Sequence, residues 1–218
     1  YRELKKGRFD CIQAAELYQP STLIAALACR SLFVWKELDQ FFSRPVTRWL
    51  QKFFHRTIEK WLRTKVLVIP RSGSSGRFLK ERGWNKIESV IPSPVDTEVF
   101  KPLPSTREEE YLLVVSRIGP RRGLEFLLET MKQAAKIKPG IKLRLVGRGP
   151  WLSKFGEAVR AQGLTSSIEI IDDFLPHPEM NRIYNRCFMS LIVTDKALFP
   201  FAAMESMAAG KPVISRLR

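Results

Sequence analysis

The sequence predicts an α/β fold in which helices cover parallel β-sheets. Short β-branched or apolar runs recur along the chain, amphipathic segments separate them, and the runs are almost continuously hydrophobic. Alternating strands and helices are typical of a parallel sheet, and strands that are hydrophobic throughout are covered on both faces. The expected strands are residues 31–35, 66–69, 111–115, 143–146, 168–171 and 189–193.

Helices and turns are predicted from spacing and from residues that end helices. Apolar residues recur at helical spacing from Leu124 to Met131, and Pro139-Gly140 ends that helix. A small-residue helix ends at Gly210, and Lys211-Pro212 then leads into a further strand, because glycine accepts the left-handed conformation and proline cannot continue a helix. Polar residues from Pro102 to Glu110 predict a loop.

Length and composition allow one large domain or two small ones. The chain has 218 residues, of which 44% are hydrophobic, and this is enough to form the cores of such domains. The charged fraction of 27% and the spread of aromatic residues argue against disorder. The proline-containing segment Ile91–Asp96 predicts a stiff connection. We therefore divide the chain into residues 1–92 and residues 93–218.

Charge and cysteine usage limit the partners and the compartment. The net charge of +15 favours anionic partners, namely nucleotide phosphates, anionic lipid or nucleic acid, or it serves solubility alone. The 3 cysteines have no metal-type spacing, so we expect them to be reduced and buried in a cytoplasmic protein. No apolar run is long enough to cross a bilayer, and the first residues do not resemble a signal peptide.

A candidate phosphate-binding loop, Ser116–Gly123, lies between an expected strand and an expected helix. Gly119 and Gly123 would let the backbone approach a ligand, and Arg117 and Arg122 can each bind phosphate oxygens through a planar fork. Ligands of doubly wound sheets lie at this edge, where helix N-termini attract anions. The alternative is a surface loop with scattered arginines.

Two further segments are of interest. Gly147-Arg148-Gly149-Pro150 follows a strand and indicates either a ligand-binding turn or only a tight strand–helix turn. In the small-residue helix, Ala202 and Ala203 leave the helix start open, and Glu205 could accept hydrogen bonds from a ribose diol or only complement the helix dipole.

Taken together, these segments resemble family 4 of the retaining glycosyltransferases, which have the GT-B fold. The hinge motif I-P-N-G-V-D-x-x-x-F is similar to residues 91–100, and G-R-L-x-x-x-K-G is similar to residues 116–123, with Arg122 in the lysine position. The turn V-G-x-G-P matches residues 146–150, and E-A-M-A-x-G-x-P-V matches residues 205–213. A weaker similarity to D-V-I lies at residues 10–12.

The resemblance implies two Rossmann-like domains, both incomplete in this chain. Residues 1–92 would be part of the acceptor-side domain, and residues 93–218 would be a truncated nucleotide-sugar-binding domain; the chain would be a fragment or a truncated relative.

The implied reaction is retaining transfer of a sugar from a nucleoside-diphosphate donor to a lipid-linked or polysaccharide acceptor, without a metal or other cofactor. Arg117, Arg122 and Glu205 would be catalytic. The other implied donor-binding residues are Ser116, Gly119, Gly123, Gly147, Ala202, Ala203 and Met204.

The sequence departs from the family pattern at two places. A glutamate eight positions before Glu205 usually contacts the transferred sugar, but Ala197 stands there, with Asp195 nearby. A histidine usually follows the strand at 31–35, where this chain has Lys36 and Glu37, a candidate acceptor-side pair or an ordinary surface pair. A non-catalytic nucleotide-sugar-binding remnant is therefore an alternative function. A basic nucleic-acid-binding protein is a less favoured one, because the sequence lacks zinc-type spacing and a basic tail.

Residues 46–63 predict an amphipathic helix with an apolar, aromatic stripe and basic residues beside it. The stripe comprises Val46, Trp49, Leu50, Phe53, Phe54, Ile58, Trp61 and Leu62. Such a helix suits an anionic membrane surface at the inner face of the membrane. The preferred interpretation is a helix packed on the sheet with a solvated basic face.

Overall fold

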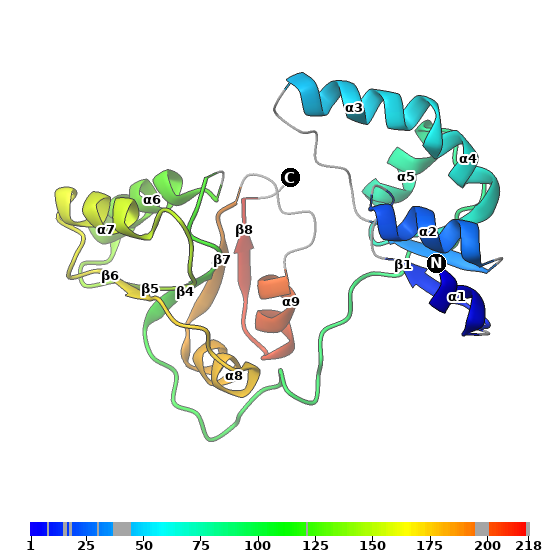
Figure 1. The fold of residues 1–218 in the computed structure, drawn as a ribbon. Helices are drawn as coiled ribbons and strands as arrows, with labels where there is room; N and C mark the ends of the chain where they lie inside the picture. The colour runs from blue at the N-terminus through cyan, green and yellow to red at the C-terminus, as the bar shows by residue number, and fades with distance from the viewer. Residues whose placement is uncertain are drawn as a thin grey trace. The chain divides into compact units, whose positions relative to one another are not determined.

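The computed structural model describes residues 1–7, 9–14, 17, 19–29, 31–36, 45–120, 122–194 and 201–216. The chain forms two compact units, Tyr1–Ser93 and Pro94–Arg218 (Figure 1). They divide within the proline-containing segment Ile91–Asp96. The assignment of the first unit to the acceptor side stays a prediction. Across the described residues, no helix combines the length and apolarity that a membrane span requires.

The first unit is built on a parallel sheet of three strands in the order β1-β2-β3. The strands are β1 (Ile12–Ala14), β2 (Leu32–Lys36) and β3 (Val66–Pro70). The helices are α1 (Arg2–Lys6), α2 (Pro20–Ala28), α3 (Pro45–Arg56), α4 (Ile58–Lys65) and α5 (Gly73–Glu81). The core includes Val34, Leu62, Val68 and Trp84. The strand β1 was not expected from the sequence, because its three residues are too short to show a pattern.

The second unit is built on five parallel strands in the order β6-β5-β4-β7-β8. The strands are β4 (Tyr111–Val115), β5 (Lys142–Val146), β6 (Ile168–Ile171), β7 (Met189–Ile192) and β8 (Val213–Ser215). The helices are α6 (Leu124–Ile137), α7 (Leu152–Ala161), α8 (His177–Arg186) and α9 (Phe201–Ala208). One apolar cluster includes Leu127 on α6 and Phe155 on α7, and a separate cluster includes Tyr184 on α8.

The predicted α/β fold with parallel sheets is confirmed. The six expected strands are present with bounds shifted by about one residue, and β8 is the further strand expected after Pro212. The apolar runs could be recognised as strands because strands that are covered on both faces have few polar positions. Residues 111–114 of β4, for example, are all buried.

The prediction of one continuous helix over residues 46–63 is wrong. The helix is interrupted at Thr57, where φ is −115° and ψ is −77°, so that α3 and α4 are separate helices. The apolar stripe is divided as well. Phe54, Ile58 and Leu62 pack against the core, whereas Trp49 and Phe53 are 64% and 52% exposed.

A buried carboxylate fixes α4 in the first unit. Glu59 is 1% exposed and accepts a hydrogen bond of 2.8 Å from the indole Nε1 of Trp84. The guanidinium groups of Arg63 and Arg82 lie 3.4 Å and 3.7 Å from its oxygens, and His55 also contacts it. Because an unpaired buried charge is costly, these partners hold α4 with Glu59 facing inward.

The helix α8 anchors the segment that enters the second unit. The Asn181 and Asn185 side chains accept hydrogen bonds from the backbone N–H groups of Lys101 and Leu103, at 3.2 Å and 2.7 Å. Both asparagines are buried, and Asn185 also donates to the Lys101 carbonyl oxygen at 3.0 Å. The segment after the proline-containing boundary is therefore an integral part of the second unit.

The three cysteines are free, as expected, but they are not all buried. Cys187 is buried, Cys29 is half-buried and Cys11 is exposed. The expectation of burial is wrong for Cys11, because it lies before the short strand β1 rather than inside an element.

Candidate functional site

The candidate site lies at the carboxyl edge of the sheet in the second unit. From β4 the chain crosses to β5 and β6 on one side, and β7 and β8 lie on the other side. The strand order therefore reverses between β4 and β7. In open parallel sheets, ligands bind outside the carboxyl ends of the strands at such a switch point.

The loops after β4 and β5 are joined by backbone hydrogen bonds. The Ser116 and Ile118 N–H groups donate to the carbonyl oxygens of Val146 and Arg148, at 3.1 Å and 2.9 Å. A Cβ atom on Gly147 would lie 2.0 Å from the Ser116 oxygen, and one on Gly149 would lie 2.0 Å from the Ile118 oxygen. Only glycine fits these two positions. Packing of the two loops therefore requires both glycines of the Gly-x-Gly turn, whether or not the turn also binds a ligand.

Gly123 brings the loop after β4 against the end of β7. It has φ +70°, precedes the first residue of α6, and a Cβ atom there would lie 1.9 Å from the Val193 carbonyl oxygen. At Gly119, by contrast, a Cβ atom would make ordinary contact with Pro150 at 3.8 Å. The protein itself therefore requires glycine at position 123 but not at position 119.

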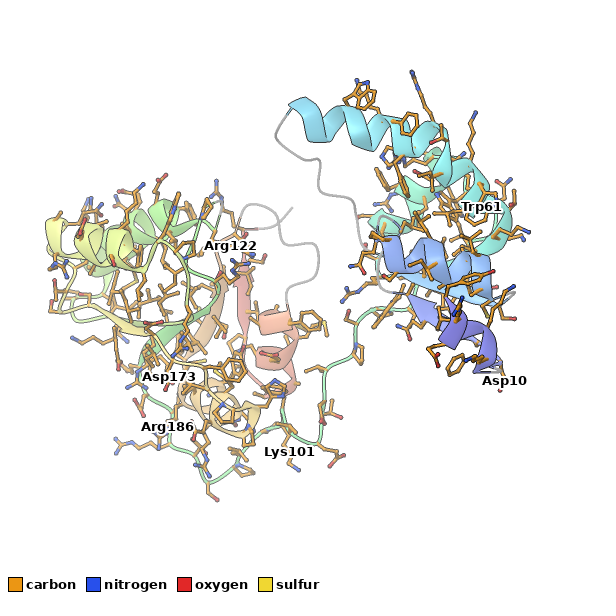
Figure 2. All side chains as sticks on the ribbon, viewed as in Figure 1. Asp10, Trp61, Lys101, Arg122, Asp173 and Arg186 are labelled. Atoms are coloured by element: carbon orange, nitrogen blue, oxygen red, sulfur yellow. The ribbon has the colours of Figure 1, made fainter. Side chains whose placement is uncertain are left out.

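The two candidate arginines lie beside this switch point. Arg117 is exposed and Arg122 is half-buried, and neither guanidinium has a hydrogen bond or ion pair within the described part of the chain. Arg122 immediately precedes Gly123, which lies against Val193 at the end of β7 (Figure 2). The first N–H groups of α6, which have no partner inside the helix, face the same edge. Both features favour an anion.

The helix α9 carries the candidate carboxylate. Glu205 is half-buried, one turn from the start of α9, and its Oε2 accepts a hydrogen bond of 2.8 Å from the Tyr184 hydroxyl on α8. Ala202 and Met204 are half-buried and Ala203 is buried. Ser206 donates to the Ser190 hydroxyl on β7 at 2.8 Å and so fixes α9 against the sheet.

Several predicted residues cannot be placed. Glu37, Asp195 and Ala197 lie outside the described residues, and of Lys36 only the backbone, at the end of β2, is described. The acceptor-side pair therefore stays a prediction.

An open recess of about 640 Å³ lies at the opposite, amino edge of β4, β5 and β6. Its charged groups are paired: Arg144 lies 3.2 Å from Glu109 and 2.7 Å from Glu169. The other cation of this recess, Lys142, donates to the Ser166 carbonyl oxygen at 2.6 Å. The two candidate arginines have no such partner among the described residues, so we place the candidate site at the switch point.

Two residues that shape the candidate site were missed in the sequence. Gly149 was part of a recognised motif. It follows a strand closely, and a glycine at such a turn indicates that another backbone segment approaches it. Tyr184 shares helical spacing with Met180 and Asn181, so the sequence shows it as an ordinary core residue. Its contact with Glu205 spans 21 residues and has no sequence signal.

Comparison with solved structures identifies the fold as that of the GT-B glycosyltransferases. HepE of Anabaena in complex with UDP superposes over 98% of this chain and 62% of its own, with a TM-score of 0.78 and 17% identity. Staphylococcus aureus TarM superposes over 84% of this chain and 36% of its own, with a TM-score of 0.67 and 12% identity.

Residues 95–216 match the family model of the glycosyl transferases group 1, and the chain belongs to this family. It is 30% identical over 135 residues to the uncharacterized glycosyltransferase YqgM of Bacillus subtilis, covering 62% of this chain and 37% of that protein. It is 28% identical over 155 residues to a lipopolysaccharide 1,2-N-acetylglucosaminetransferase of Salmonella typhimurium, covering 63% and 40%. The chain thus spans well under half the length of these relatives.

Proposed function

We propose that the chain is part of a retaining glycosyltransferase of family 4, and that its second unit binds the nucleoside-diphosphate sugar. The observation that carries the proposal is the position of Arg117 and Arg122, which have no ion pair among the described residues, at the switch point of the sheet beside the N-terminus of α6. Group 1 family membership and the GT-B fold support it.

In the proposed reaction the arginines bind the diphosphate. They stabilise its growing negative charge as the bond between the sugar and the diphosphate breaks, and the N–H groups of α6 add to this effect. Backbone N–H groups near Ala202 and Ala203 contact the phosphate, and Glu205 accepts hydrogen bonds from the ribose hydroxyls. Ser116 and the glycines at 119, 123 and 147 let the loops approach the donor closely.

We propose a lipid-linked or polysaccharide acceptor. The Salmonella relative acts on lipopolysaccharide, as its name states, and this supports an acceptor of that type. The first unit, with Lys36 and Glu37 after β2, is the proposed acceptor side.

We also propose that α3 contacts an anionic membrane at its inner, cytoplasmic face. Trp49 and Phe53 stack with ring centroids 5.9 Å apart and are exposed, and Lys52 and Arg56 are exposed on the same helical face. The sequence from residue 45 to residue 65 contains one acidic residue, Glu59, and its side chain is buried. An exposed surface that is aromatic and positively charged suits an anionic interface.

The donor-binding proposal is tested by titration calorimetry with UDP, GDP and ADP. We expect at least one diphosphate to bind, and we expect Arg117→Ala and Arg122→Ala each to weaken binding about tenfold or more, as for hydrogen bonds to charged groups. Arg160→Ala, at an exposed position at the end of α7, is the control and should change nothing. Absence of binding, or unchanged binding by both variants, would refute the proposal.

Donor binding without sugar transfer is the second candidate function. It is favoured by Ala197, which stands where the family usually has a sugar-contacting glutamate. Transfer or hydrolysis of the donor by the full-length protein would exclude it.

A further inference from the structure

We propose that Tyr184 is a positioning residue for donor binding: its hydroxyl holds one oxygen of Glu205 so that the other accepts hydrogen bonds from the donor ribose. This inference rests on the proposed function, because it assumes that Glu205 binds the ribose. It adds a residue on α8, outside the motifs that suggested the donor site.

The geometry of Tyr184 allows it to hold the carboxylate firmly. Its side chain is fully buried, and its hydroxyl lies 2.8 Å from Oε2 of Glu205. The ring of Phe100 packs against the Tyr184 ring edge to face, with centroids 6.0 Å apart and an angle of 73° between the planes. A phenol confined in this way has little rotamer freedom to lose when the carboxylate is fixed.

Glu205 has an oxygen left for a ligand. Within the described residues, the Tyr184 hydroxyl is the hydrogen-bond partner of its carboxylate, and that bond engages Oε2. An ionised carboxylate can accept several hydrogen bonds, so Oε1 can serve the ribose hydroxyls. The backbone of α9 is fixed independently by the Ser206–Ser190 bond of 2.8 Å.

The protonation state of Tyr184 is consistent with this role. Burial, and then the charge of Glu205, raise the pKa of the Tyr184 hydroxyl above its ordinary value. The hydroxyl therefore stays protonated at neutral pH and acts as the donor in the pair. The bond to an ionised acceptor is of the stronger kind.

A purely structural role gives a different expectation. A buried phenol requires an acceptor in any protein. In that case, loss of the Tyr184 hydroxyl would lower stability without changing the preference for the ribose over the 2′-deoxyribose form of the nucleotide. Tyr111 supplies a matched control. It is also buried in the same apolar cluster, and its hydroxyl donates at 2.8 Å to a backbone oxygen of α8, that of Ile183, rather than to Glu205.

The test compares UDP, GDP and ADP with their 2′-deoxy forms by calorimetry, below the melting temperature of each variant. We expect the wild type to prefer the ribose form about tenfold, the strength of a hydrogen bond to a charged group. In Tyr184→Phe the preference should fall to about twofold or less, through weaker binding of the ribose form alone. Tyr111→Phe should keep the wild-type preference, and Arg122→Ala should weaken both forms equally.

The outcomes separate the two proposals. If the wild type binds no diphosphate, the proposed function fails and this inference falls with it. If the wild type binds but shows no ribose preference, or if Tyr184→Phe keeps the full preference, donor binding stands and the positioning role of Tyr184 is overturned.

Discussion

Gly123 and Val193 lie so close together that a Cβ atom on the glycine would be 1.9 Å from the valine carbonyl oxygen. One residue follows β4 and the other follows β7, the two strands between which the sheet order reverses. The contact fixes the start of α6 against the end of β7. It therefore sets the positions of the N–H groups of α6 and of Arg122, which the proposed donor site requires.

We predict that Gly123→Ala destabilises the second unit strongly. The left-handed backbone at this position costs about 1 kcal/mol for a non-glycine residue, and the contact with Val193 forces the two loops apart at additional cost. Gly163→Ala is the matched control, because it has a similar φ of +67° and no atom within 4 Å of the added Cβ. Urea unfolding measures both variants, and equal losses would contradict the steric argument.

A second prediction concerns the buried carboxylate of the first unit. Glu59→Gln keeps the shape but removes the charge that faces Arg63 and Arg82, so we expect a loss of roughly 3 kcal/mol in the free energy of unfolding. Tryptophan fluorescence is a suitable measurement, because Trp84 is buried beside Glu59.

Glu81→Gln is the control for this charge change. Glu81 ends α5 at an exposed position, so removal of its charge should alter stability by less than about 0.5 kcal/mol. Similar stability of both variants would show that the Glu59 network contributes little to the first unit.

The third prediction tests the membrane proposal for α3. The wild-type chain should float with vesicles of equal parts phosphatidylglycerol and phosphatidylcholine at low salt, and less so with phosphatidylcholine alone. Replacing both Trp49 and Phe53 by alanine should reduce flotation severalfold, since two exposed rings no longer enter the interface.

Phe174→Ala is the control for loss of an exposed aromatic ring. Phe174 is 81% exposed but follows Asp172 and Asp173 in the sequence, so its neighbours are acidic rather than basic. Its removal should leave flotation unchanged. Failure of the wild type to float at low salt would refute the membrane proposal.

The sequence predicted the strands of the second unit because buried parallel strands are long enough apolar runs to recognise. It did not predict the break at Thr57, because residues on both sides continue the helical spacing. The partners that turn Glu59 inward include Arg82 and Trp84, which lie more than twenty residues away in the chain. Helical periodicity contains no information about such distant partners.

The candidate site shows the same limit. The loops after β4 and β5 were recognisable because glycine and arginine occur at fixed spacing within each short segment. The hydrogen bond between Tyr184 and Glu205 joins α8 and α9, which β7 separates along the chain. Neither residue therefore indicates the other in the sequence. The local motifs were recognisable in the sequence, whereas the contact that supports Glu205 depends on tertiary packing.

The hydrogen bonds from α8 to residues 101 and 103 determine where the second unit can be cut from the rest of the chain. A shortened chain that starts at β4 would leave the buried side chains of Asn181 and Asn185 without the backbone groups that they bind. These asparagines lie on the same helix as Tyr184, so the loss would disturb the support of Glu205 as well. A separately produced second unit should therefore begin at Pro94 or earlier, with the connecting segment retained as part of its core.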